Sequence, residues 1–289
     1  LNTKECPYAC VMCGYWKDTL DSTPSPSELV NQFRFALEKI GKIDAIKIYN
    51  SGNFFDDGAI PPTARHEIAN LVKDLKLVTV ESRWNYIDEK AIEFASQLNG
   101  ALEVAIGLEV ADNKKLLEIN KKMTSKAFKK AATFLQENGI YVKAYMLVKP
   151  PFTTEKQALK LGKQTIDFAF NCGIYTLSIL PTAVMDGFIS YLAKNRFFKL
   201  PSLWTVYRLA EYAHQKGFER VFVDLLNFDQ LISCKNCPEL FRRAFELLNK
   251  LQILLKVECD CKKDWPILLK QDSVRPFKEL VRKIIVKKV

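Results

Sequence analysis

Three cysteines near the start of the chain are spaced so that they could act together as ligands. Cys6, Cys10 and Cys13 are separated by three and then two residues, so one short loop can turn three thiolates toward the same small object. That pattern predicts an iron–sulfur cluster. A cubane cluster has four irons and normally takes four cysteine ligands, so three cysteines would leave one iron open to a substrate or cofactor. A structural zinc loop is the alternative, but zinc would need a fourth ligand from elsewhere in the chain.

Four further cysteines form a second candidate metal site near the other end of the chain. They make a CxxC and a CxC separated by 21 residues: Cys234, Cys237, Cys259 and Cys261. Four thiolates with no open position are typical of structural zinc, which we expect here. An auxiliary iron–sulfur cluster takes the same ligands and stays an alternative, as do unligated thiols.

The start of the chain shows no sign of secretion. Residues 1–4 (LNTK) do not begin an apolar segment, and no run reaches the roughly 18 apolar residues of a membrane helix. We therefore expect a cytoplasmic protein without membrane association, whose eight cysteines remain thiols and favour metal ligation over a disulfide framework. Because there is no initiator Met, we also expect residues to precede Leu1.

The charge of the chain favours a polyanionic partner. Lysine and arginine number 43 against 33 aspartates and glutamates, which gives a net charge of +10. Such an excess attracts nucleic acid. A general enrichment of lysine on solvated faces is the alternative explanation.

The elements that must position these residues alternate between helix and strand. Periodicity and turn residues predict helices near 26–39, 62–75, 88–98, 125–138 and 153–171, and strands near 43–49, 77–83, 102–109, 141–148 and 176–180. This βα spacing indicates a parallel sheet, and the number of repeats favours an α/β barrel or partial barrel.

Ligands of such sheets bind beyond the carboxyl ends of the strands. The polar residues predicted to lie there are Asn50–Asn53, Glu81–Arg83, Gly107–Glu109, Lys149 and Pro181–Thr182. Each has an ordinary explanation. Ser51–Gly52 can be a simple turn, Glu81 and Arg83 a rim ion pair, and Glu109 a helix cap or salt-bridge partner. Lys149 is a candidate for substrate contact.

Beyond residue 186 the alternation loosens. We expect helices near 187–195, 202–216 and 239–250, a strand near 219–224, and a closing helix near 276–285. The segment from Arg275 to Lys288 places lysine and arginine opposite an apolar face, which could bind phosphates or simply dock a helix with a solvated face. We expect a barrel domain over residues 1–230 and a cysteine-rich extension over 231–289.

The cysteine loop resembles that of the radical S-adenosylmethionine (SAM) superfamily, in which a bulky residue, here Met12, usually precedes the third cysteine. The resemblance covers roughly residues 1–230 and implies a partial (β/α)6 barrel. It also implies that Cys6, Cys10 and Cys13 ligate a [4Fe-4S] cluster whose open iron binds SAM, and that reductive cleavage of SAM yields a 5′-deoxyadenosyl radical. The residues that it implies as SAM contacts are Tyr15, Asn50, Ser51, Gly52, Glu81, Arg83 and Glu109.

Longer segments look like the radical SAM subunit of archaeosine biosynthesis, a family related to the radical SAM domain of the Elongator catalytic subunit. The matching segments are Cys10–Asp18, Tyr49–Asp56, Val80–Arg83, Gly107–Glu109 and Ile119–Thr124. The resemblance implies a tRNA substrate and an external electron donor. It also implies a partner enzyme that attaches lysine to a 7-cyano-7-deazaguanine base. The radical subunit would then act as a lyase on that adduct and leave archaeosine.

Two other functions stay open from the sequence. A radical SAM enzyme could act on a small molecule or peptide, in which case the charge excess would be incidental. A zinc-bound nucleic-acid adaptor without catalysis would be colourless and would carry zinc alone.

Overall fold

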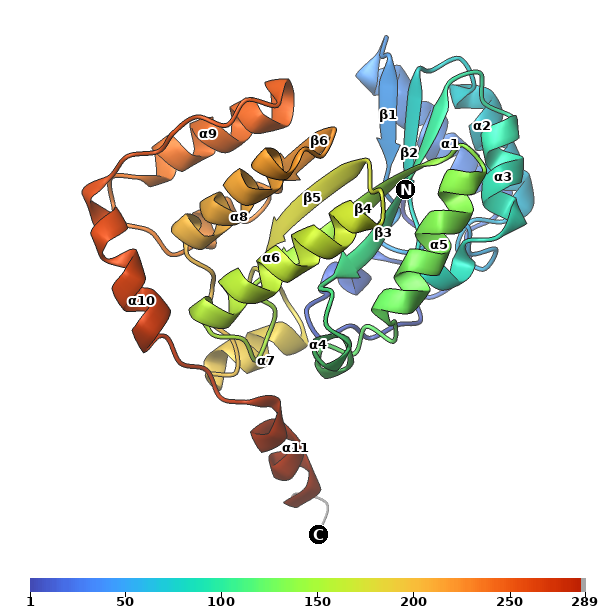
Figure 1. Ribbon diagram of the computed structural model, residues 1–289. Helices are drawn as coiled ribbons and strands as arrows, with labels where there is room; N and C mark the ends of the chain where they lie inside the picture. Colours follow the sequence, from blue (N-terminus) through green and yellow to red (C-terminus); the bar gives the residue numbers. More distant parts are fainter. Residues whose placement is uncertain (287–289) are drawn as a thin grey trace. The chain divides into compact units, whose positions relative to one another are not determined.

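The structure is a computed structural model that describes the backbone of residues 1–286 and the side chains of residues 1–282. Strands and helices alternate along it (Figure 1). The strands are β1 (Ala45–Ile48), β2 (Leu77–Glu81), β3 (Ala101–Glu109), β4 (Tyr141–Val148), β5 (Thr176–Pro181) and β6 (Arg220–Val223). The α-helices are α1 (Pro26–Ile40), α2 (Pro62–Val72), α3 (Glu89–Ser96), α4 (Asn113–Glu118), α5 (Ser125–Glu137), α6 (Glu155–Asn171), α7 (Phe188–Lys194), α8 (Leu203–Lys216), α9 (Pro238–Leu251), α10 (Trp265–Gln271) and α11 (Phe277–Val286). Four short 3-10 helices are η1 (Tyr15–Asp18), η2 (Trp84–Tyr86), η3 (Phe228–Gln230) and η4 (Asp260–Lys263).

The six strands form one sheet in the order of the sequence, β1 to β6. Pairing is parallel: Ala45 pairs with Leu77, Leu77 with Ala101, and Thr176 with Arg220. Strand β3 buries every residue except Ala101 and Gly107, as expected for a parallel strand covered on both faces. Sequential strands joined through helices make a half-barrel, so the predicted α/β partial (β/α)6 barrel is confirmed.

The chain divides into two compact units, with boundaries inside β3 and β4. The first contains Leu1–Ala9, Tyr15–Gly107 and Lys126–Ala144. In this unit α1 begins at a capping box, in which Ser25 accepts from the Glu28 N–H, and ends at Gly41, whose φ of 76° suits glycine. Phe54, Phe55 and Phe94 pack edge to face in its core.

The second unit contains Cys10–Gly14, Leu108–Ser125 and the chain from Tyr145 onward. Helices α6 and α8 approach closely at Gly162, where a Cβ would lie 2.5 Å from Leu209 Cδ1. Helix α9 has a strongly one-sided apolar face and buries Phe241, Phe245 and two other residues. Its phenylalanines pack with Trp204 and Tyr207 of α8, so the cysteine-rich extension joins the core of this unit.

Every helix and strand predicted from the sequence is present within a few residues of the expected bounds. Helices α4 and α10 were not predicted, since six or seven residues are too few to show a helical period. The predicted basic helix at the end is α11, but the side chains beyond Arg282, including those of Lys283, Lys287 and Lys288, lie outside the described residues. Within the described part of the chain, no helix combines the length and apolar character needed to span a membrane.

Candidate active site

The segment that carries Cys6 is held at the carboxyl ends of β1 and β2. The Thr3 hydroxyl donates to the Asn50 carbonyl at 3.0 Å, and the amino group of Leu1 donates to the Tyr49 carbonyl at 2.7 Å. The Asn53 side-chain N–H groups face the Cys6 sulfur at 3.8 Å. Cys6 therefore lies beside the turn after β1, where the sequence predicted a ligand site.

The turn after β1 is tight and fixed by Glu81. The Asn50 N–H donates to Glu81 Oε1 at 3.2 Å, and the Phe54 N–H donates to the Glu81 carbonyl at 2.9 Å. Ser51 has a φ of 53°, and a Cβ at Gly52 would lie 3.4 Å from Asn50 Nδ2. Three predicted cofactor-binding residues of this turn are thus brought together with Glu81.

Arg83 connects this turn to the cysteine loop. Its backbone N–H donates to Asn53 Oδ1 at 3.0 Å, and its guanidinium carbon lies 3.7 Å from the centre of the Tyr8 ring. The Tyr8 hydroxyl accepts from Asn85 Nδ2 at 2.8 Å. From the sequence, Asn53 was expected only as part of the turn after β1, and Tyr8 was assigned no role. Tyr8 lies between Cys6 and Cys10, and this position could have marked it as a candidate site residue.

Tyr86 packs edge to face against Tyr8, with ring centres 6.4 Å apart. Burial, together with the charge of Asp56, raises the pKa of the Tyr86 phenol. This phenol therefore stays protonated at neutral pH and keeps its hydrogen to donate. Tyr15, another predicted SAM contact, lies in η1 with 40% of its surface exposed.

In the second unit, Cys10 and Cys13 belong to one tight turn. The Cys13 N–H donates to the Cys10 carbonyl at 3.1 Å, and the Val11 N–H donates to the Ile119 carbonyl at 3.0 Å. Val11 and Met12 pack against a buried hydrophobic cluster, and this packing fixes the backbone between the two cysteines.

Glu109 ends β3 with a φ of 60° and is 7% exposed. Its carboxylate binds Lys121 Nζ at 2.5 Å. This is the salt bridge that the sequence left open as the ordinary explanation for Glu109. A contact between Glu109 and SAM stays a prediction.

Lys149 has a different role from the substrate contact considered from the sequence. It is fully buried, and its Nζ lies 2.6 Å from Glu155 Oε2, 2.9 Å from Asp272 Oδ2 and 3.2 Å from the Leu200 carbonyl. Burial favours the neutral form of Asp272, but bonding to Lys149 outweighs it and lowers the pKa of this carboxyl. The lysine ties the segment before α11 to the end of β4.

Polar atoms without a protein partner lie at several strand ends. Among the described residues, Asn50 Oδ1 after β1 and Ser82 Oγ after β2 are buried and make no hydrogen bond, and in the second unit the same holds for Thr182 Oγ1 after β5. These residues are 1%, 3% and 3% exposed. Because leaving such atoms unpaired costs about 1–3 kcal/mol each, they are suited to a bound polar ligand.

The four C-terminal cysteines form one cluster. All their sulfurs lie within 4.8 Å of one another, and neighbouring pairs are 3.3 to 3.7 Å apart. Trp204 Nε1 donates to Cys261 Sγ at 3.3 Å. Burial alone would raise the pKa of Cys234, but hydrogen bonds from Cys237 and the Asn236 N–H outweigh it and lower that pKa to about 7.

The spacing of the sulfurs can be compared with the two kinds of metal centre that the sequence left open. Tetrahedral zinc with bonds of about 2.3 Å places its sulfurs about 3.8 Å apart. A cubane cluster spreads its four cysteines over four irons and needs a wider set. The observed sulfurs therefore fit a single metal ion.

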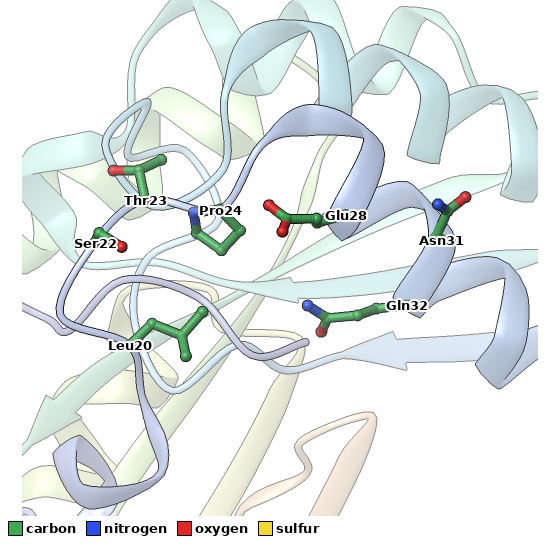
Figure 2. Close-up of a pocket in the computed structure, with 7 residues that line it drawn as sticks. All are labelled: Leu20, Ser22, Thr23, Pro24, Glu28, Asn31 and Gln32. Atoms are coloured by element: carbon green, nitrogen blue, oxygen red, sulfur yellow. The ribbon is translucent and has the colours of Figure 1, made fainter.

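A surface hollow of about 440 Å³ lies elsewhere in the first unit (Figure 2). Figure 2 shows Glu28 and Gln32 extending from α1 toward the segment Leu20–Pro24. Both side chains already bond to the chain, Glu28 to Ser25 and Gln32 to the backbone of Asn2. Since none of the predicted site residues lines this hollow, it is not a candidate active site.

Residues 3–162, more than half of the chain, match the radical SAM superfamily. The chain therefore belongs to the radical SAM superfamily, as the cysteine loop and the half-barrel indicated.

Its relatives include two proteins named archaeosine synthase subunit beta. The chain is 30% identical over 276 residues to archaeosine synthase subunit beta of Methanosarcina acetivorans, which covers 90% of this chain and 80% of the relative. It is 26% identical over 279 residues to the same subunit of Thermococcus kodakarensis, with 90% and 86% covered. An uncharacterised protein of Methanocaldococcus jannaschii is 30% identical over 292 residues, with 92% and 79% covered.

Solved structures share the fold. Methylornithine synthase has a TM-score of 0.56 at 12% identity and covers 99% of this chain and 80% of its own. Elp3 of Methanocaldococcus infernus has a TM-score of 0.55 at 17% identity, with 80% of this chain and 65% of that chain covered. At these identities the comparison supports the half-barrel and nothing about substrate.

Proposed function

We propose that this radical SAM enzyme acts on a modified base in tRNA, as the lyase that cleaves a lysine–deazaguanine adduct to leave archaeosine. The observation that carries the proposal is similarity along 90% of the chain to two proteins named archaeosine synthase subunit beta. The net charge of +10 supports a polyanionic substrate. A partner enzyme would attach the lysine before this chain acts.

We further propose that Cys6, Cys10 and Cys13 hold a [4Fe-4S] cluster and that the strand ends hold SAM. The unpaired buried oxygens of Asn50 and Ser82 support a ligand that brings hydrogen-bond donors, and SAM has an amino group and ribose hydroxyls. The proposed SAM contacts are Tyr15, Asn50, Ser51, Gly52, Glu81, Arg83 and Glu109. When bound, the cluster and SAM supply hydrogen-atom abstraction from the substrate, with electrons from an external donor.

The contribution of the chain itself is to hold these groups in place. Asn53 faces the Cys6 sulfur with its side-chain N–H groups and accepts from the Arg83 N–H with its oxygen, so one amide joins the cysteine loop to the end of β2. Arg83 in turn lies over Tyr8. The 1% exposure of Asn53 keeps water from competing for these bonds.

Anaerobic reconstitution tests the class of chemistry. The unaltered chain should bind iron and sulfide, absorb broadly in the visible, and release 5′-deoxyadenosine from SAM on reduction. Cys10→Ala should abolish this release, whereas Cys172→Ala, a cysteine outside both clusters, should not. Equal release from both variants would refute the assignment of the cysteine loop.

The tRNA proposal needs its own experiment. The reduced enzyme is incubated with tRNA that carries the lysine adduct, and the nucleosides are analysed by mass spectrometry for archaeosine. Binding of tRNA should weaken steeply with salt, since each phosphate contact releases counterions. Turnover of a small molecule in the absence of RNA, with no change in the tRNA, would refute the proposal.

We also propose that Cys234, Cys237, Cys259 and Cys261 bind one zinc ion. Four thiols whose neighbouring sulfurs lie 3.3 to 3.7 Å apart match a closed site that takes four thiolate ligands. The site would join the start of α9 to η4. Metal analysis of the purified chain should find one zinc per chain in addition to iron.

A further inference from the structure

A buried hydrophobic cluster joins the cysteine loop to four other parts of the second unit. Its buried members are Phe152, Ile189, Leu192, Phe197, Phe198 and Leu280. Val11 and Met12, which lie between Cys10 and Cys13, pack against it, and so does Phe277 of α11. The residues between Cys10 and Cys13 therefore pack in the same cluster as α7, the segment 194–200 and α11.

The start of α7 is fixed directly beside the cysteine loop. Gly14 follows Cys13, and a Cβ at Gly14 would lie 2.9 Å from the Asp186 carbonyl and 2.9 Å from Met185 Cβ. Such distances mean that the two backbones touch with no room for a side chain. Asp186 is two residues before Phe188, the first residue of α7, so the start of α7 lies close to the loop.

Two aromatic rings stand on that outer face. Phe188 and Tyr191 are stacked, with ring centres 5.6 Å apart and planes at 15°. They are 44% and 42% exposed, while Ile189 and Leu192 on the other face are fully buried. Two stacked rings that are both partly exposed present an apolar surface on which a further planar group can stack.

The surroundings of the two rings are basic. Lys194 and Arg196 follow on the same segment and are exposed, as are Lys278 and Arg282 of α11. The Arg275 N–H donates to the Arg196 carbonyl at 2.8 Å, which fixes the start of α11 to this segment. Over residues 183–200 and 275–282 there are six lysines and arginines against two acids, Asp186 and Glu279.

We propose that Phe188 and Tyr191 are a stacking platform for an unpaired base of RNA, with the surrounding cations holding the neighbouring phosphates. This rests on the proposed function, because it takes RNA as the substrate, and it assigns a binding surface beside the cysteine loop. A planar apolar face within a basic rim matches an RNA base and its backbone.

The test compares variants of the two rings in the full chain. Phe188→Ser with Tyr191→Ser should weaken binding of a tRNA transcript by about 10-fold or more, as lost base stacking does. The slope of affinity against salt should not change, because no phosphate contact is lost. Tyr191→Phe keeps the ring and should bind as the unaltered chain does. Phe35→Ser, which removes a ring that is 62% exposed on α1, is the matched control and should have no effect.

A second pair of variants tests the basic rim. Lys194→Gln and Arg196→Gln should each reduce the salt slope by about one, as expected for the loss of one phosphate contact. Release of 5′-deoxyadenosine without RNA should be the same in all these variants, since none touches the cysteines or the strand ends.

Three outcomes would overturn the platform. If the unaltered chain binds tRNA and the double serine variant binds it equally well, the platform is wrong and the proposed function stands. If the double variant loses release of 5′-deoxyadenosine in the absence of RNA, the rings support the cysteine loop instead. If the unaltered chain shows no salt-sensitive tRNA binding, the platform and the tRNA proposal both fail.

Discussion

Replacing Lys149 by methionine is the sharpest test of how the second unit is held together. The lysine side chain has no exposed surface, and its ammonium bonds to Glu155, Asp272 and the Leu200 carbonyl. Methionine fills much of the same space without the charge. It would leave two carboxylates, 0% and 2% exposed, facing each other without their buried cation.

The size of the effect follows from that burial. Removing one partner of a buried ion pair typically costs about 3–5 kcal/mol, since the remaining charge stays desolvated. Two backbone groups still donate to these carboxylates, the Ser202 N–H to Glu155 and the Glu155 N–H to Asp272. The partly exposed Lys199 also stays 3.4 Å from Asp272, so we expect about 4 kcal/mol rather than the upper end of this range. With a urea slope of about 3 kcal/mol per molar, the unfolding midpoint should fall by more than about 1 M.

The assay is urea unfolding of the full chain, followed by tryptophan fluorescence under anaerobic conditions. Lys76→Met is the matched control, because Lys76 and Asp44 form an ion pair at 3.4 Å whose side chains are 79% and 77% exposed. The urea midpoint of Lys76→Met should equal that of the unaltered chain. A Lys149→Met midpoint within 0.3 M (roughly) of that control would refute the buried network.

The pH dependence gives an independent readout of the same network. Burial raises the pKa of the Asp272 carboxyl and bonding to Lys149 lowers it, so without Lys149 the pKa of Asp272 in the folded chain should rise. Protonation then removes the buried charge. As pH falls, the free energy of unfolding of the variant therefore rises relative to that of the unaltered chain. The gap between the two midpoints should therefore narrow from pH 7 toward pH 4.

Three further predictions concern single positions. Cys237→Ser should release the metal held by the C-terminal cysteines, whereas Cys172→Ser should keep it, as measured by metal analysis; equal metal content would count against the proposed site. The lowered pKa of Asp272 stabilises the fold above the ordinary aspartate value of 3.8, and this contribution is lost as pH falls through the lowered pKa. Asp272→Asn should thus flatten the fall of the urea midpoint between pH 5 and pH 3, and an unchanged slope would contradict it. Gly14→Ala should push the cysteine loop away from Met185 and reduce iron uptake on reconstitution, while Gly58→Ala, whose Cβ would meet only the end of the Asp56 side chain, should not.

Lys149 also illustrates where reading the sequence fails. Its place after a strand, at the edge where ligands bind, made substrate contact a reasonable expectation. Whether a lysine at such an edge is open or buried depends on what packs over it. Here Asp272 from the C-terminal segment covers it, and no local pattern around either residue shows that pairing.

The cysteine-rich extension shows the opposite case. Two pairs of cysteines at metal-ligand spacing predicted a common site, and their sulfurs do meet. The spacing could not distinguish a single ion from a cluster, because both take four cysteines. The separations of 3.3 to 3.7 Å between neighbouring sulfurs come only from the tertiary structure, and the proposal of a single zinc ion rests on them.

The sequence by itself determined the class of this protein, because a cysteine loop and alternating helices and strands are local patterns, written in neighbouring residues. It also placed Asn50, Glu81 and Arg83 at strand ends. Only the tertiary structure decided that Asn53 faces Cys6 across 47 positions of the chain, and that Phe188 and Tyr191 stay in water beside a loop that lies far away in sequence. Such contacts depend on how separate elements pack, and packing depends on the shapes of many side chains at once rather than on any one stretch.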